Sequence, residues 1–335
     1  MKQVPTVICV DVEPDARQPD LHAGTKWTGF EESLQLFEEL RCRSGIEPIF
    51  CWFLRMDPQI EIVHGSAHWV VERYRTQIEN LRSAGDEIGL HTHAWRHVGG
   101  KWITDNGDQR WVNQCVRVSF EAYESAFGSG CRSFRFGDHW MNNETFDLVE
   151  NLGAQYNLTV EPGLRSSAPA GLSPLEVCTG RFPDYATVPR EPYKPTREDF
   201  TKCAGARDER EMWVIPVSTA LIPHWPVAPF YRRVIWRTRY GRRLYYPLSL
   251  AHDPDQFRHS LGDVVEGENA RHLCVVLRTD STISHLSARV RENLELLLSL
   301  AADGGLQLMT PARLVAATTG LTSQCDEWLL RAQVT

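Results

Sequence analysis

The feature that most constrains the fold is a regular alternation of short apolar segments with segments of helical periodicity. The apolar segments are rich in β-branched residues and end at charged or turn residues, which is typical of buried strands. This alternation predicts an α/β protein in which a parallel sheet is connected by helices. The expected strands are residues 6–12, 48–54, 87–91, 133–137, 154–160, 213–217, 273–277 and 306–309.

Two helices are expected between the first three strands. Thr28 and Glu31 have the spacing of a capping box, and Gly45 follows as a C-terminal stop signal. A second apolar periodicity begins near Ser66 and ends at Gly85, which predicts another helix there.

Two segments interrupt the alternation. Residues 161–195 contain seven prolines, which excludes a regular helix or central strand and predicts a long loop over about 161–210. Residues 230–246 hold six arginines and no acid, within an insertion at about 223–247. Neither segment resembles a domain boundary, so we expect one domain over 1–320 and a C-terminal helix or tail over 321–335.

Composition narrows the class of protein. The 36 Lys and Arg residues against 43 Asp and Glu residues give a formal net charge of −7, which argues against a general nucleic-acid binder. The sequence has no apolar stretch of about 18 residues and no signal-peptide pattern, so we expect a cytoplasmic protein. The nine cysteines form no CxxC pair, and we expect most of them to be small buried apolar residues.

Acidic residues end the first expected strand. Strand geometry places Asp11 and Glu13 on the same side, where two carboxylates raise one another's pKa unless a cation lies between them. A metal ion or an arginine is therefore expected there.

Histidines follow the third expected strand. His91 and His93 share one face if the strand continues, and two imidazoles with a carboxylate form a zinc site that leaves a position for water. His97 is a competing ligand if the chain becomes helical at Ala94. The choice between His93 and His97 stays open at this point.

These motifs, in this order, resemble the polysaccharide deacetylase superfamily, also called the NodB-homology family. The resemblance covers roughly residues 4–310. It rests on VDVE at 10–13, GDEIGLHTHAW at 85–95, SFRFGDHW at 133–140 and WVIPVS at 213–218. It implies a single-domain, distorted (β/α) barrel of about seven parallel strands that holds one divalent metal, usually zinc.

The resemblance also implies roles for individual residues. Asp11 resembles the catalytic base, Glu13 and His91 resemble metal ligands, and Arg135 resembles the arginine that holds the base. Trp95 stands where the family has its second metal histidine, so that ligand comes from His93 or His97.

The sequence departs from the family pattern at two further places, the SFRFGDHW motif at 133–140 and the end of the 273–277 strand. Asp138 and His139 replace the usual proline-containing continuation and are candidates for contacts with metal or substrate. The family's general-acid histidine is replaced near Arg278 and Asp280. His139 or Asp280 is then a candidate proton donor, and Arg278 a candidate for stabilising an oxyanion.

The resemblance implies a metal-dependent deacetylase or amide hydrolase acting on an N-acylated sugar during surface-polysaccharide or other glycan synthesis. One alternative is a deacetylase-like protein that binds metal and sugar without hydrolysing it. Another is a different metal-dependent barrel hydrolase, but those folds usually carry an H-x-H pair after the first strand rather than the third.

The remaining predictions concern substrate binding. Trp95 and Trp140 are expected to contact the carbohydrate. In the arginine-rich segment, Arg237 and Arg239 lie among aromatic residues, a combination suited to phosphate or to a membrane surface. The segment is therefore expected to hold a nucleotide- or lipid-linked substrate, with peripheral contact at the inner face of the membrane as one form of that interaction.

Overall fold

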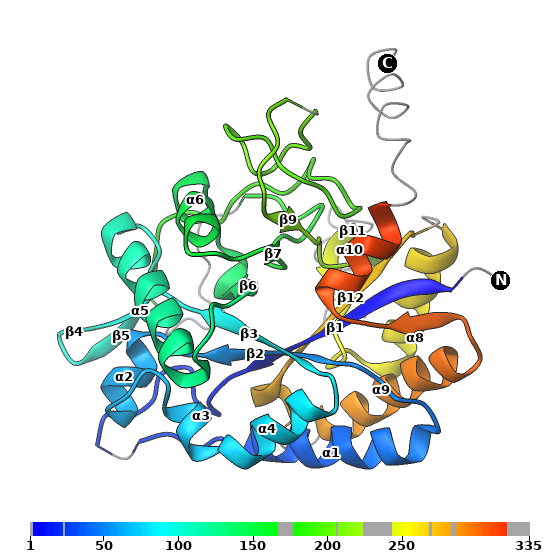
Figure 1. Cartoon of the computed structure of the whole chain (residues 1–335), viewed down its shortest axis with the longest axis horizontal. Helices are drawn as coiled ribbons and strands as arrows, with labels where there is room; N and C mark the ends of the chain where they lie inside the picture. The colour runs from blue at the N-terminus through cyan, green and yellow to red at the C-terminus, as the bar shows by residue number, and fades with distance from the viewer. Residues whose placement is uncertain are drawn as a thin grey trace, which may run out of the picture.

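The computed structural model describes residues 3–22, 24–166, 177–205, 207–223, 243–267, 270–282 and 286–319. Its centre is a curled sheet of parallel strands in the order β12-β1-β2-β3-β6-β7-β9, with β13 also pairing with β1 (Figure 1). All eight strands predicted from the sequence are present. They are β1 Val4–Val12, β2 Cys51–Arg55, β3 Glu87–Thr92, β6 Ser133–Phe136, β7 Tyr156–Asn157, β9 Trp213–Val214, β12 Leu273–Arg278 and β13 Leu306–Leu308.

Irregular backbone connects the two ends of this sheet. Beyond β9, the Ser218 N–H donates to the Cys274 carbonyl of β12 over 3.0 Å, and the Cys274 N–H donates to the Ser218 hydroxyl. Leu248 and Leu250 add backbone hydrogen bonds to Val276 on the same strand. These contacts curl the sheet into the distorted α/β barrel that the motifs predicted.

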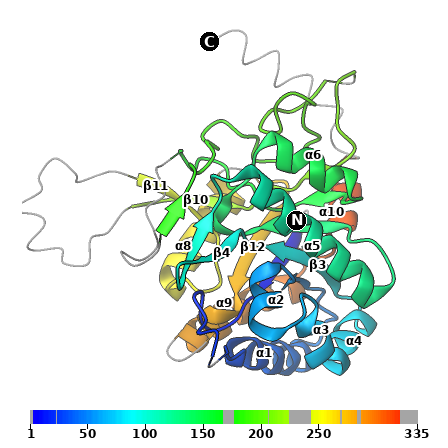
Figure 2. The same ribbon diagram turned by 90° about the vertical axis from the view of Figure 1, so that its left-hand side faces the viewer.

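Helices cover the outside of the curled sheet. In Figure 1, α1, α4 and α9 lie along its lower side and α5 and α6 along its left side, and Figure 2 shows the same layer after a 90° turn. The helices are α1 Thr28–Ser44, α2 Pro58–His64, α3 Trp69–Arg73, α4 Arg75–Ser83, α5 Gln109–Phe127, α6 Asn143–Asn151, α8 Pro254–Gly262, α9 Leu286–Ala302 and α10 Pro311–Thr319. Short helical turns are η1 Gly137–His139, η3 Asp263–Gly267 and η4 Thr279–Thr282.

Two smaller sheets lie beside the barrel. One contains β4 Trp95–Val98, β5 Lys101–Asp105 and β8 Val177–Thr179. The other is an antiparallel pair of β10 Thr219–Pro223 and β11 Arg243–Pro247. The first of these sheets begins only three residues after β3, so the chain forms a hairpin where the sequence allowed a helical turn at Ala94.

Alternate residues of the central strands face two different apolar layers. Ile8, Val10 and Val12 belong to the larger core between the sheet and the helices. Val7 and Cys9 belong to a second cluster inside the barrel, which also contains Cys51, Phe53, Cys274 and Val276. This period of two determines which side chains reach the barrel interior at the strand ends.

The first helix ends as predicted but begins differently. Gly45 adopts the left-handed conformation at its C-terminus, with φ 68°. At its N-terminus the predicted capping box is wrong, because Trp27 occupies the cap position and its side chain makes no capping bond. The Asp15 carboxylate instead accepts the N–H groups of Thr28 and Gly29 at 3.0 and 2.9 Å. The helix predicted from Ser66 is divided into α3 and α4.

Several sequence predictions fall outside the described residues. These include residues 224–242 of the arginine-rich insertion and the C-terminal segment 321–335. The described part of the Pro-rich loop contains the short strand β8 and no regular helix. Among the residues that the structure describes, no helix has both the length and the apolar character needed to cross a membrane.

Candidate metal centre

Charged side chains extend the interior faces of the central strands at their carboxyl ends. In β1, Asp11 follows Val7 and Cys9 on the interior side, and in β2, Arg55 follows Cys51 and Phe53. The same alternation brings His91, Arg135 and Arg278 to the interior ends of β3, β6 and β12. Because parallel strands place their carboxyl ends at one edge, these polar groups form a layer above an apolar interior.

The side chains of Glu13, His91 and His93 converge on one point at this edge. The Nε2 atoms of His91 and His93 are 3.0 Å apart, and Glu13 Oε1 lies 3.3 Å from the first and 3.5 Å from the second. All three residues are buried. Ligands at zinc–ligand distances of about 2.0–2.1 Å in tetrahedral geometry are about 3.3–3.4 Å from one another. The three atoms therefore have the spacing of a metal-binding triad.

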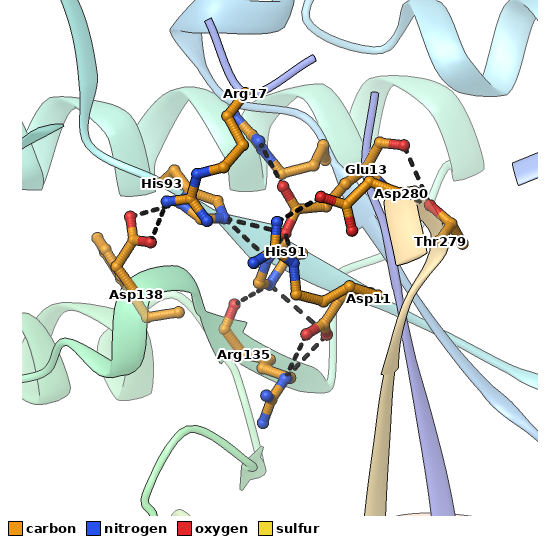
Figure 3. A network of polar contacts seen from close by, with 12 residues as sticks. Asp11, Glu13, Arg17, His91, His93, Arg135, Asp138, Thr279 and Asp280 are labelled. Atoms are coloured by element: carbon orange, nitrogen blue, oxygen red, sulfur yellow. Dashed lines mark hydrogen bonds and ion pairs between the residues drawn. The ribbon is translucent and has the colours of Figure 1, made fainter. Parts of the chain in front are cut away.

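Outer partners orient both imidazoles. His91 Nδ1 donates to the backbone carbonyl of Arg135 at 3.1 Å, and His93 Nδ1 donates to the Asp138 carboxylate at 2.9 Å. Figure 3 shows the His93 ring between Asp138 and His91. Because Nδ1 of each ring faces an oxygen acceptor, Nε2 of each ring faces the other ring and Glu13, where it can offer a lone pair to a metal ion.

This arrangement fits a divalent cation. Three electron-pair donors within 3.5 Å repel one another unless positive charge lies between them. A proton on one Nε2 would satisfy one of these contacts, whereas a metal ion satisfies all three. Nitrogen and carboxylate ligands in this number are those of catalytic zinc sites with an open position.

Nearby cations keep Glu13 ionised. Burial alone would raise the pKa of Glu13, but Arg278 and the two histidines lower it well below its usual range. Arg278 Nε and Arg55 Nη1 each lie 3.3 Å from a different Glu13 oxygen. Arg55 is itself held by Asp57 at 2.6 Å, so the buried guanidinium is fixed beside Glu13.

Asp138 has a second partner beyond His93. Arg17 Nη2 lies 2.5 Å from its other carboxylate oxygen. Burial opposes ionisation, but His93 and Arg17 hold the pKa of Asp138 far below its usual range. The loop after β1 therefore supports the imidazole of His93, directly after β3.

Asp11 lies beside the triad but has a different partner. Arg135 Nε donates to both Asp11 carboxylate oxygens at 2.8 and 3.0 Å, and Arg135 Nη1 donates to the Leu158 carbonyl. Asp11 Oδ1 is 3.8 Å from His91 Nδ1, on the side of His91 away from the three converging atoms (Figure 3). The arginine thus orients a carboxylate next to the triad without making it part of the triad.

The end of β12 lies directly against β1. Arg278 pairs in register with Asp11, and the Thr279 hydroxyl exchanges hydrogen bonds with the Glu13 backbone. Asp280 accepts a 2.5 Å bond from Arg278 Nη2. Burial raises the pKa of Asp280, whereas this ion pair favours its charged form.

The structure separates the two histidines that competed as ligands. His93 joins Glu13 and His91, whereas His97 lies on β4 with its ring against Trp102, at 5.0 Å between centroids. The helical turn that would have brought His97 to the site is replaced by the β4–β5 hairpin. Asp138 contacts His93 rather than joining the triad.

A glycine makes room for the His93 ring. A Cβ on Gly137 would lie 2.1 Å from the ring atoms of His93. Only glycine therefore permits this approach of the β6 end to the triad.

Two of the four predicted substrate contacts lie among the described residues, and both are buried. Trp95 and Trp140 are buried, with Arg17 over the first ring and Phe136 against the second, so neither offers an open ring face to a sugar. That prediction is not supported. Arg237 and Arg239 lie outside the described residues.

Sequence reasoning missed four supporting residues of the site. They are Arg17, Arg55, Asp57 and Glu161. The period of two in Cys51–Arg55 would have placed Arg55 on the interior side beside Asp11. The other three follow strands in irregular segments, where the sequence carries no comparable periodicity.

Comparisons with known proteins address the fold. The sequence matches no family model and no curated protein. Among solved structures, a Mycobacterium smegmatis protein assigned as a polysaccharide deacetylase is 14% identical, with a TM-score of 0.53 over 96% of this chain and 91% of that one.

Two further solved structures match with lower TM-scores. A GH57 branching enzyme from Thermococcus kodakaraensis is 15% identical, with a TM-score of 0.48 over 94% of this chain and 71% of that one. The peptidoglycan deacetylase PdaC from Bacillus subtilis is 11% identical, with a TM-score of 0.41 over 99% and 98%.

The first comparison confirms the fold that the motifs implied. It does so from the arrangement of the backbone, independently of the four motifs. The chain therefore has the distorted α/β barrel fold of a protein assigned as a polysaccharide deacetylase.

Proposed function

We propose that this protein is a metal-dependent hydrolase that removes an acyl group from an amide nitrogen of a carbohydrate. The observation that carries the proposal is the convergence of Glu13 Oε1 with the Nε2 atoms of His91 and His93 beside an oriented carboxylate. The fold of the M. smegmatis protein supports the carbohydrate assignment.

Glu13, His91 and His93 would hold the metal, and two nitrogen ligands with one carboxylate favour zinc. When bound, such a metal acts as a Lewis acid toward a carbonyl oxygen and lowers the pKa of water. The chain's own contribution is to fix the ligands in position through the carbonyl of Arg135 and the carboxylate of Asp138.

Asp11 would accept the proton of the attacking water. Its carboxylate is buried next to the triad, and Arg135 fixes its orientation through both oxygens. The water oxygen bonds to the acyl carbon and the carbon–nitrogen bond then breaks. The products are a carboxylic acid, released as its anion, and a free amine, whose nitrogen requires one proton.

Arg278 favours a second candidate function. It occupies the end of β12, where the resemblance predicts the general-acid histidine, and it is paired with Asp280 and Glu13. Without a proton donor the same site would bind metal and an N-acylated sugar but would not hydrolyse the amide. The two functions differ in turnover and share the metal site.

Acetate release from a panel of substrates distinguishes these functions. The purified full chain with one equivalent of zinc would be incubated with chitooligosaccharides, peptidoglycan fragments and a nucleotide-linked N-acetylhexosamine. We expect acetate from at least one class of substrate and none after treatment with a chelator. Zinc binding without acetate from any substrate would favour the non-hydrolytic function.

The expectations of a cytoplasmic location, a nucleotide or lipid carrier and membrane contact stay predictions. The segment that motivated the last two lies outside the described residues. Comparing free and carrier-linked sugars in the same panel tests the carrier directly.

A further inference from the structure

A second histidine–carboxylate contact lies at the same end of the barrel as the triad. His139 Nδ1 is 2.6 Å from Glu161 Oε1, and this pair is called the His139–Glu161 dyad below. The histidine is in η1 at the carboxyl end of β6, and the glutamate follows the β7 segment, next in the sheet. The residue before His139 is Asp138, which contacts His93 of the triad.

The backbone that carries His139 is strained. Asp138 and His139 have φ values of 53° and 56°, and they are consecutive non-glycine residues in the left-handed region. Such conformations are costly for residues with a Cβ and persist where surrounding contacts fix them, often at functional sites. Here the turn directs Asp138 to His93 and Arg17, and it directs His139 to Glu161.

The two members of the dyad differ in exposure. The Glu161 side chain is 2% exposed, whereas the His139 side chain is 40% exposed. Because the contact with Glu161 uses Nδ1, the opposite ring nitrogen Nε2 remains for a substrate. The Tyr185 hydroxyl donates to the His139 carbonyl, and the Phe182 ring packs edge-on to the imidazole at 6.5 Å between centroids. A buried carboxylate behind a partly exposed imidazole is a common arrangement for proton transfer.

We propose that His139 donates the proton to the leaving amine, with Glu161 as the residue that positions and charges it. The proposal rests on the proposed function and assigns the proton donor that the β12 end lacks. As the carbon–nitrogen bond breaks, its electron pair moves to nitrogen, which takes the proton from His139 Nε2. The proton that Asp11 accepted from water returns to His139 through solvent, so the cycle balances.

Charge around the imidazole supports this role. Burial alone would lower the pKa of His139, but Glu161 raises it above the ordinary histidine value. The other charged groups acting on His139 are Arg135, which opposes protonation, and Asp138, which favours it. A histidine with a raised pKa keeps its proton to higher pH.

The groups at the β12 end are weaker candidates. The Asp280 carboxylate is engaged by the Arg278 guanidinium at 2.5 Å, so a proton raised onto it by burial would have to displace this ion pair. Arg278 itself holds its proton too tightly, because Glu13 and Asp280 raise its pKa.

Two substrates separate proton donation from a structural role. The leaving group of an N-acetyl sugar needs a proton, whereas that of 4-nitrophenyl acetate leaves as an anion. In the zinc-loaded full chain, we expect His139→Gln to lower amide hydrolysis by about 100-fold or more and to leave ester hydrolysis nearly unchanged. The matched control is His259→Gln, since His259 also faces a carboxylate, that of Asp263 at 3.5 Å, but its side chain is exposed on α8. We expect it to change neither rate.

Two outcomes would overturn the donor role of His139. An equal loss on both substrates would show that His139 only supports the structure, and no loss on either would show that another group donates. For Glu161→Gln, we expect the alkaline limb of the pH profile for amide hydrolysis to move to lower pH, because His139 then loses its proton earlier.

A titration without turnover tests the pairing itself. In the full chain with labelled histidines, the His139 resonance is assigned by its loss in His139→Gln. We expect its pKa to lie above about 6.5 in the wild type and to fall in Glu161→Gln. An unchanged pKa would overturn the pairing. If the wild type hydrolysed neither substrate, the proposed function and the donor role would both fail, while this titration would still report whether the dyad exists.

Discussion

The ends of β1 and β12 lie side by side, but they present different chemistry. Beyond β1, Glu13 faces the Nε2 atoms of two imidazoles whose Nδ1 atoms already have partners, so three potential ligand atoms converge. Beyond β12, Arg278 and Asp280 neutralise each other. One region is arranged to receive a cation, and the other already contains one.

This difference separates metal binding from proton donation. In the family that the motifs resemble, a histidine near the second region supplies the proton. Here Arg278 reaches Glu13 Oε1 at 3.3 Å and therefore competes with a metal for the same oxygen. A hydrolytic site with no histidine at the end of β12 needs a proton donor elsewhere, and His139 in η1 is the donor proposed here.

The largest expected effect is on metal binding by the triad. His93→Ala removes one of three ligands and should weaken zinc binding by more than about 100-fold, beyond the 10- to 100-fold typical of outer partners. His97→Ala is the matched control and should bind zinc like the wild type. Competition with a chromophoric chelator measures both. If His97→Ala weakened zinc binding and His93→Ala did not, the second histidine ligand would be His97 on β4.

The next effect concerns the carboxylate that shares this edge without belonging to the triad. Asp11→Asn keeps the size of the side chain and removes the proton acceptor. It should lower amide hydrolysis by about 10²- to 10⁴-fold while zinc affinity stays unchanged. Initial rates and the same chelator competition provide the two readouts. Full turnover in this variant would refute the assignment of Asp11 as the base.

A smaller effect probes the β12 region directly. Arg278→Gln removes the guanidinium that competes for Glu13 Oε1, so zinc affinity should rise by up to about tenfold, equivalent to about 1.4 kcal/mol. Arg258→Gln is a suitable control, because Arg258 is an exposed arginine on α8. If zinc affinity fell in Arg278→Gln, Arg278 would support the site rather than compete with the metal.

The smallest effect lies in the loop that leaves β1. Asp15→Ala removes the carboxylate that caps α1 and should lower the free energy of unfolding by about 1 kcal/mol. Thr28→Ala should cost less, since the structure replaces the predicted capping box with Asp15. Urea unfolding measures the free energy of unfolding of both variants. A larger loss of stability in Thr28→Ala than in Asp15→Ala would show that Thr28, and not Asp15, caps the helix.

The strands were predictable because each is a short apolar segment that ends at a charged residue. Glu87–Thr92 illustrates this, since its buried residues are followed directly by the second histidine. The same periodicity of two correctly placed Asp11 with Glu13 and His91 with His93. Local sequence determines these pairs because a strand fixes the direction of every second side chain.

Features that depend on the tertiary fold were not predictable in this way. The choice of His93 over His97 depends on a hairpin after Thr92, and α1 is capped by a residue 13 positions before Thr28. The burial of Trp95 and Trp140 depends on neighbours from other segments. The left-handed turn at Asp138 and His139 was not predictable either, because neither of these positions is a glycine.

X-ray absorption at the zinc edge, on the purified full chain, tests the central claim most directly. The account predicts one zinc ion per chain, coordinated by two imidazole nitrogens and a carboxylate oxygen from His91, His93 and Glu13. In His91→Ala the bound zinc should be lost from the same preparation. A chain that binds no stoichiometric zinc, or that keeps a two-imidazole zinc site in His91→Ala, would contradict the account.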